Sequence, residues 1–180
     1  AAAPALPAEI AALQSLLDGL EWQHVRRTPD LAAACFAEAA RLDPELAAAP
    51  LAQAALELEL SEPRRADEAW RRARRLAPLM AGLLPVQAEI QAAQGDLAAA
   101  REAAAKLALA DPRDPVAMRL AGELTEAAGD RAKALKLLTA GKEAHPNDLP
   151  LHLAFARSAT AAGLAGAALT MWAQAHGTAS

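Results

Sequence analysis

The sequence predicts an all-α protein made of five helical hairpins that follow one another at a step of 34 residues. The first observation is composition: 54% of the 180 residues are hydrophobic but only 3% are aromatic. Much of the apolar share is alanine, which has the highest intrinsic helix propensity. The second is the lack of the β-branched and aromatic runs that strands favour. The third is a set of residues that recur at fixed spacing.

Three columns of residues keep this 34-residue step. They are the prolines Pro44, Pro78, Pro112 and Pro146, the alanines Ala32, Ala66, Ala100, Ala134 and Ala168, and a mostly bulky column of Phe36, Trp70, Ala104, Leu138 and Trp172. Small residues let helices approach closely, and bulky ones fill the space between units. Because one hairpin cannot bury its apolar face alone, the units must stack on their neighbours. We therefore predict that Trp70 and Trp172 are core residues rather than ligand-stacking residues.

Turn signals then divide the chain into helices. After a loose segment over residues 1–7, Pro7 is placed to open a first helix that ends near Arg26. Later helices are predicted over residues 31–42, 46–60, 64–76, 79–94, 97–110, 131–144, 149–162 and 165–176, and the first helix of the fourth hairpin is predicted to end at Gly129-Asp130. Pro85 falls near the start of its helix, where proline costs least. Asp-Pro steps separate hairpins because proline stops one helix and aspartate caps the next turn.

The segment QGDLAAAREAAAKLALADP, from Gln94 to Pro112, resembles the second half of a tetratricopeptide repeat. It has the Gly-Asp turn, Ala100 early in the return helix and the closing Asp-Pro. The resemblance covers residues 13–180 and implies a right-handed superhelical solenoid of five such repeats, with first helices lining a concave groove and return helices forming the convex back. Residues 1–180 are then one array: a lead-in over 1–12 and repeats over about 13–46, 47–80, 81–114, 115–148 and 149–180.

Charge and cysteine content exclude several classes of protein. The net charge of −4 is mild, so nothing global draws the chain to nucleic acid or to a membrane surface. No apolar run approaches the roughly 20 residues of a membrane-spanning helix. The single cysteine, Cys35, rules out an internal disulfide and a cysteine-based zinc site. Its neighbours are apolar, so we predict a buried structural thiol rather than a reactive one.

No catalytic pattern emerges from the residues. There is no glycine-rich phosphate loop after a strand and no serine-elbow motif. A histidine metal site would have to be assembled across repeats, because no two of the four histidines lie three or four apart on one helix: His24, His145, His152 and His176. Glu123 and Glu126 are close enough to couple on one helix face, but a groove-lining pair is favoured over a general acid/base pair. We predict a non-enzyme with no cofactor and no metal.

The most prominent charge feature is a run of arginines in one return helix: Arg64, Arg65, Arg71, Arg72, Arg74 and Arg75. Interleaved acids, among them Glu68 four residues before Arg72, favour a solvated face over a partner-docking patch. Nucleic-acid binding is disfavoured because no aromatic residues interleave for base stacking.

If the family arrangement holds, residues one turn apart on the first helices line the groove. These are Leu17, Glu21, His24, Leu51, Ala55, Leu58, Glu89, Ala92, Arg119, Glu123, Glu126, Leu153 and Arg157. The lysines and asparagines with which some family members grip a terminal carboxylate are not at these sites. The expected ligand is a peptide with aliphatic anchors and a basic residue that faces Glu123 and Glu126.

The last repeat is unusual because residues 158–180 contain no Asp, Glu, Lys or Arg. A terminal repeat needs a polar outer face. We therefore expect either further repeats or a cap in the natural chain, or docking of this face on a partner or a second copy.

The resemblance implies a non-enzymatic scaffold or adaptor for protein–protein interaction that binds a protein or peptide. The competing interpretation is an arm of a larger bacterial envelope or polysaccharide-assembly protein, or of an enzyme, that positions or regulates its partner domain. The dominance of Ala, Arg, Leu and Pro indicates a GC-rich bacterial coding sequence. It does not choose between cytoplasm and periplasm, and the sequence does not name the ligand.

Overall fold

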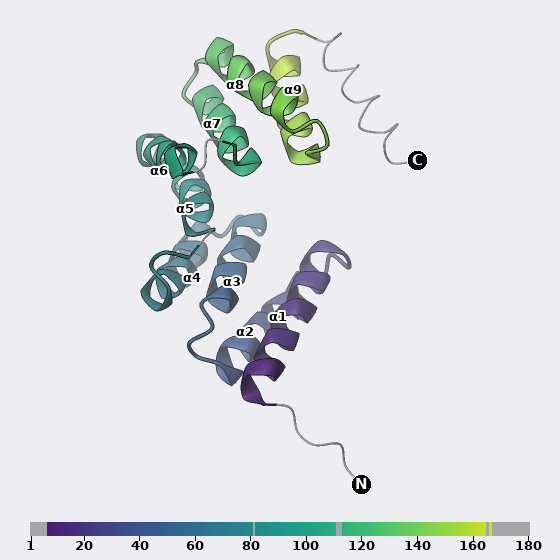
Figure 1. Cartoon of the computed structure of the whole chain (residues 1–180), viewed down its shortest axis with the longest axis vertical. Coiled ribbons are helices and arrows are strands. Elements are labelled where there is room, and N and C mark those ends of the chain that lie inside the picture. The colour runs from purple at the N-terminus through teal and green to yellow at the C-terminus, as the bar shows by residue number, and fades with distance from the viewer. Residues whose placement is uncertain (1–6, 81, 111–112, 165, 167–180) are drawn as a thin grey trace. The chain divides into compact units, whose positions relative to one another are not determined.

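The computed structural model describes residues 7–80, 82–110, 113–164 and 166, and over these residues every regular element is an α-helix. The helices follow the predicted hairpin order (Figure 1). They are α1 (Ala8–His24), α2 (Pro29–Leu42), α3 (Ala48–Glu59), α4 (Pro63–Leu76), α5 (Leu83–Ala93), α6 (Leu97–Ala110), α7 (Pro115–Ala127), α8 (Arg131–Ala144) and α9 (Leu149–Ala161).

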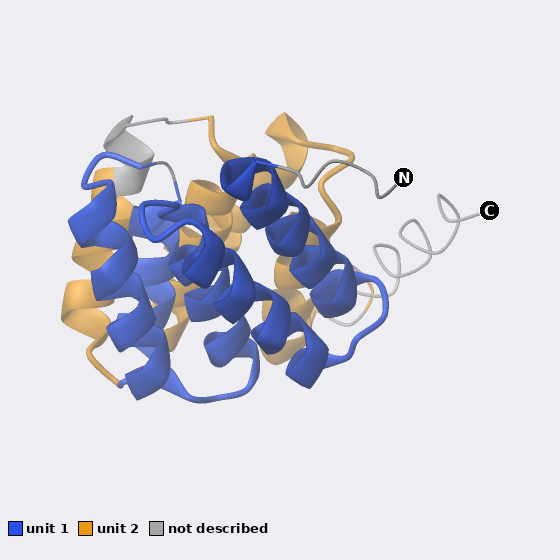
Figure 2. Cartoon of the chain, turned by 90° about the horizontal axis from the view of Figure 1, so that it is seen from below, with its two compact units in different colours: residues 1–94 blue, residues 95–180 orange. Residues whose placement is uncertain are grey.

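The chain divides into two compact units, Ala1–Gln94 and Gly95–Ser180 (Figure 2). In the first unit α1 packs on α2 and α3 on α4, while α3 also contacts α1, α2 and α5. In the second, α7 contacts α6, α8 and α9, and α8 packs on α9. The boundary falls in the turn between α5 and α6, inside the predicted third repeat. That residues 1–180 form one continuous array stays a prediction.

Most helices have a proline in their first turn or an aspartate directly before it. Proline occupies the first turn of α2, α4, α7 and α9, where its missing N–H would have had no partner within the helix. Four aspartate side chains cap the helices of the second unit, among them Asp96, which accepts a hydrogen bond from the Ala99 N–H at 3.0 Å at the start of α6. Asp114 accepts a hydrogen bond from the Val116 N–H at 2.9 Å, Asp130 from Lys133 at 3.1 Å, and Asp148 from Leu151 at 2.8 Å.

Helix α5 starts four residues later than predicted, at Leu83 instead of residue 79. The residues before it form a turn in which the Met80 N–H donates to the Ala77 carbonyl at 3.1 Å. Gly82 then takes a left-handed conformation with φ of 91° and cannot continue a helix. Pro85 is consequently in the first turn of α5, as predicted.

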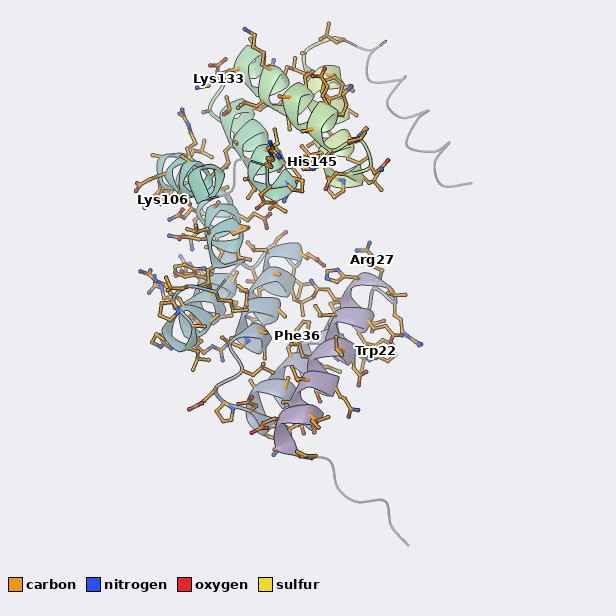
Figure 3. The ribbon with its side chains drawn as sticks, in the orientation of Figure 1. Trp22, Arg27, Phe36, Lys106, Lys133 and His145 are labelled. Atoms are coloured by element: carbon orange, nitrogen blue, oxygen red, sulfur yellow. The ribbon has the colours of Figure 1, made fainter. Side chains whose placement is uncertain are left out.

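The turn within each hairpin places one residue in the left-handed region, and these residues are also 34 apart. Gly95, Gly129 and Gly163 have φ of 83°, 90° and 78°. In the first two hairpins the equivalent residues are Arg27, with φ of 55°, and Ser61, with φ of 61°. Arg27 lies in the turn after α1 (Figure 3). The first two turns, which lack glycine, therefore use the same backbone geometry as the others.

The columns predicted to pack between helices do so wherever the structure describes them. Ala32, Ala66, Ala100 and Ala134 are each 0% exposed. The bulky column is buried as well, at Phe36, Trp70, Ala104 and Leu138. The interpretation of Trp70 as a core residue is confirmed: the side chain packs in the core of the first unit, and its indole N–H donates to the Leu83 carbonyl at 2.8 Å. Ala168 and Trp172 lie outside the described residues.

The uncharged face predicted for the last repeat falls mostly on residues 165 and 167–180, which lie outside the described residues.

Candidate functional site

Consecutive first helices touch one another in both units, α1 with α3 and α3 with α5 in the first, and α7 with α9 in the second. All the predicted groove residues belong to these helices, and His24 is the last residue of α1.

In the first unit the predicted groove residues are partly used by the fold itself. Leu51 and Leu58 are half-buried and pack against the core around Trp70. Glu21 is paired with Arg26, 2.9 Å away. The remaining predicted residues of this unit range from the exposed Leu17 and His24 to the half-buried Ala55, Glu89 and Ala92. The predicted groove residues Leu51 and Leu58 therefore contribute largely to the core of this unit.

In the second unit α7 and α9 form a pocket of about 520 Å³. It is lined by Pro115, Val116, Arg119, Asp148, Pro150, Leu153 and Arg157. Three of these, Arg119, Leu153 and Arg157, are predicted groove residues. Both helices begin at this pocket, so the prolines of their first turns provide apolar walls beside Val116 and Leu153. A second hollow next to it is lined by Glu123, Glu126, Ala127, Ala154 and Arg157.

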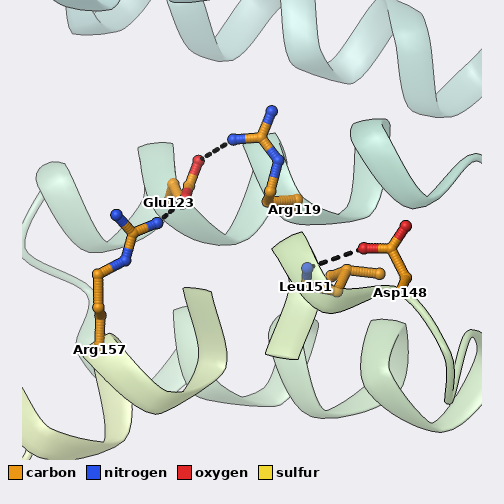
Figure 4. A network of polar contacts seen from close by, with 5 residues as sticks. All are labelled: Arg119, Glu123, Asp148, Leu151 and Arg157. Carbon is orange, nitrogen blue, oxygen red and sulfur yellow. Dashed lines mark hydrogen bonds and ion pairs between the residues drawn. The ribbon is translucent and has the colours of Figure 1, made fainter. Parts of the chain in front are cut away.

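A three-residue ion-pair network joins α7 to α9 beside the pocket (Figure 4). One Glu123 oxygen lies 2.7 Å from an Arg119 nitrogen, and the other lies 2.7 Å from an Arg157 nitrogen. The side chains of Arg119 and Glu123 are only 22% and 29% exposed, whereas Arg157 is 68% exposed. Each Glu123 oxygen thus faces its own guanidinium, a charge-assisted arrangement stronger than a neutral hydrogen bond.

This network changes the predicted role of Glu123. The expectation of a basic ligand residue facing Glu123 assumed a free carboxylate, but two arginines of the chain already neutralise it. Glu126 is half-buried and lines the neighbouring hollow, where no ion pair reaches it from the residues that the structure describes.

Sequence reasoning missed several residues of this face. The pocket walls Pro115, Val116 and Pro150 are not among the predicted groove residues. The signal for the network was present, because Glu123 and Arg157 are 34 apart and so occupy equivalent positions in successive repeats. The first unit has a comparable link, in which the buried Gln23 donates from α1 to Glu59 on α3 at 2.9 Å.

The arginine run of α4 is mostly engaged within its own unit. Arg71 pairs with Asp67 at 2.8 Å, and the Arg74 guanidinium lies 5.3 Å from the centre of the Trp70 ring. Arg72 donates to Gln53 on α3 at 2.9 Å rather than pairing with Glu68 as expected. The reason is that Gln53 brings an acceptor from the neighbouring helix, which a pattern along one helix does not show.

Other features of the described residues bear on possible chemistry. Cys35 is half-buried, and burial, with a smaller effect of Asp18, raises the pKa of its thiol. Among the described residues, no three His, Cys, Asp or Glu side chains come together as metal ligands would. Within the same residues, no helix has the length and apolar character needed to span a membrane.

Comparison with known proteins yields matches in structure alone. No protein-family profile matches the chain, and no curated relative matches it. The thermophilic TPR protein TTC0263 of Thermus thermophilus is 22% identical, with a TM-score of 0.81, and the match covers 92% of this chain and 90% of that one. PilW, a widely conserved type IV pilus biogenesis factor, is 22% identical with a TM-score of 0.73, covering 92% of this chain and 76% of PilW.

YrrB, a TPR protein with an unusual peptide-binding site, is 16% identical with a TM-score of 0.57. That match covers 91% of this chain and 84% of YrrB. All three proteins align over nine-tenths of the chain, and the helices, turn residues and buried columns described above repeat at the spacing that a tetratricopeptide unit requires. The chain thus has the fold of the tetratricopeptide repeat proteins.

Proposed function

We propose that this protein is a non-enzymatic scaffold for protein–protein interaction that binds a peptide segment on the α7/α9 face. The observation that carries the proposal is the pocket of about 520 Å³ between the starts of these two helices. Its walls are mainly apolar, and a small number of charged groups stand at one side. This combination is typical of sites that bind a ligand by apolar contact and orient it by polar contact.

The fold supports this proposal because stacked hairpins expose one helix of each repeat along a continuous face. YrrB, which shares the fold, has a peptide-binding site. The described residues of the α7/α9 face contribute arginine, carboxylate and aliphatic side chains, which suit recognition of a peptide better than bond cleavage.

A second candidate function is that of a repeat arm within a larger bacterial envelope assembly. The similarity to PilW favours it. The two candidates differ in the coding sequence around this chain: a membrane or catalytic domain in the same reading frame favours the arm, and its absence favours the independent scaffold.

Selection from a displayed library of random twelve-residue peptides tests the proposed site. Peptides retained by the parent protein are expected to lose binding to Leu153→Asp, because a carboxylate then stands in the apolar pocket. Leu149→Asp is the matched control, since Leu149 lies one turn earlier on α9, is 51% exposed and does not line the pocket. Circular dichroism verifies that both variants are folded. Equal binding by both variants, or binding lost only on reversal of Arg64 and Arg75, places the working surface elsewhere.

A further inference from the structure

We propose that the ligand of the α7/α9 face carries an acidic side chain in the middle of its sequence, with aliphatic residues on one side and a basic residue on the other. This inference rests on the proposed function and adds the chemistry of the partner. The acidic residue binds Arg157, for which it competes with Glu123.

The count of hydrogen-bonding groups gives the first reason. A guanidinium has five N–H donors, and among the described residues Arg157 donates only to one oxygen of Glu123. Both oxygens of Glu123 are already engaged, one by each arginine. The exposed side of the network therefore offers donors, and a ligand that binds there has to bring acceptors. A carboxylate is the peptide group that accepts two parallel N–H bonds from a guanidinium.

The N-terminal ends of α7 and α9 also favour binding of an acidic group. The first turns of α7 and α9 both reach the pocket, and each helix start carries about half a positive charge from its aligned peptide groups. Asp148, the one carboxylate among the pocket walls, is turned toward its own helix and accepts from the Leu151 N–H at 2.8 Å (Figure 4). Its charge is thus directed at the backbone of α9, and an incoming carboxylate meets the arginines.

The position of Arg157 decides where the acidic residue stands in the ligand. Arg157 lines both the apolar pocket and the neighbouring hollow. A peptide that fills both hollows passes Arg157 with chain on either side, so the acidic group is internal and not the terminal carboxylate. Its aliphatic side chains enter the pocket at Val116 and Leu153, and a basic residue reaches Glu126 in the second hollow.

The test uses pools of ten-residue peptides that are acetylated at the N-terminus and amidated at the C-terminus. Each pool has Leu, Val or Pro in the four positions before a central residue and one Lys within the four positions after it. The central residue is Glu in one pool, Gln in the second and Lys in the third. A fourth pool has Gln at the centre and a free terminal carboxylate. Binding to the intact chain is measured by fluorescence anisotropy at low and moderate salt.

We expect the central-Glu pool to bind about tenfold more tightly than the central-Gln pool, as is usual for one charge-assisted hydrogen-bonded pair. Arg157→Gln should remove most of this difference. Glu123→Gln should strengthen binding of the Glu pool several-fold, because the internal competitor no longer holds the arginines. Arg131→Gln, an exposed arginine on α8, is the control and should change neither.

The outcomes separate this inference from the proposed function. Equal binding of the Glu and Gln pools, preference for central Lys, a preference for the free-carboxylate pool, or weaker binding to Glu123→Gln overturns the acidic ligand. The proposed site still stands in each of these cases if Leu153→Asp abolishes binding and Leu149→Asp does not. Failure of every pool to bind, or equal effects of those two substitutions, overturns both.

Discussion

The turn after α3 contains a residue that the fold holds in an unfavourable backbone conformation. Ser61 has φ of 61°, at a position where the later hairpins have glycine with φ of 78° to 90°. A left-handed conformation costs a residue with a Cβ about 1–2 kcal/mol. We therefore predict that Ser61→Gly stabilises the protein.

The size of the effect follows from two opposing quantities. Glycine relieves the left-handed cost, but it loses about 0.5–1 kcal/mol more backbone entropy than alanine on folding. The net gain is about 0.5–1 kcal/mol. No contact is sacrificed, because Ser61 is exposed and the hydrogen bond of its N–H to the Leu58 carbonyl, at 3.0 Å, belongs to the backbone. For a chain of this length the melting temperature should rise by about 1–4 °C.

Urea and thermal unfolding followed by circular dichroism measure the change. Ser61→Ala is the matched control: it removes the same hydroxyl but keeps the Cβ and the strain, so it should bring no comparable gain. Gly129→Ala is the converse, since no atom lies within 4 Å of the added Cβ and only the φ of 90° opposes it; it should cost about 1 kcal/mol. A Ser61→Gly variant no more stable than Ser61→Ala, together with a silent Gly129→Ala, would refute the reasoning.

Three further predictions concern the packed interior. Ala100→Trp should destabilise the protein by about 1–3 kcal/mol in urea unfolding, because Ala100 is 0% exposed; Ala98→Trp on the exposed side of the same helix should be nearly silent, and equal effects would contradict the assignment. Gly122→Ala should be destabilising because the new Cβ would lie 2.5 Å from Leu138, which is fully buried. The cost should shrink in a Leu138→Ala background, and a cost independent of Leu138 would show that the clash is not its cause. Cys35 should react slowly with a disulfide reagent in the folded protein, and its reaction should rise only at a pH above the usual thiol range because its pKa is raised. Rapid reaction at neutral pH without unfolding would contradict this.

The sequence alone was sufficient to predict the helices of the described residues and their pairing, while the helix predicted over residues 165–176 lies outside the described residues. The step of 34 residues identified the hairpins, and the alanine and bulky columns identified the core, because a repeated unit must bury the same positions in every copy. The start of α5 was wrong by four residues. The cause is Gly82, whose left-handed conformation depends on how the chain enters the next helix and leaves no periodic signal.

The candidate site was only partly predictable for a related reason. The resemblance implied which helices line a groove, so Arg119, Leu153 and Arg157, which line the pocket, are among the predicted groove residues. Whether a side chain on that face is free to meet a ligand depends on its neighbours in other helices. Leu51 and Leu58 pack into the core, and Glu123 is held by two arginines, one of them from α9.

The sequence by itself therefore determined the periodic part of this protein, namely its helices, its hairpin turns and its buried columns. Local helix and turn preferences fix the first two, and the columns follow because every repeat must bury the same positions. The tertiary structure alone decided how charges are paired between the helices of the proposed binding face. An ion pair between α7 and α9 forms or fails according to the distance between two helices, and that distance is a property of their packing. Along α7 alone Glu123 has one arginine partner, Arg119, four residues earlier; only the packing of α7 on α9 adds the second, Arg157.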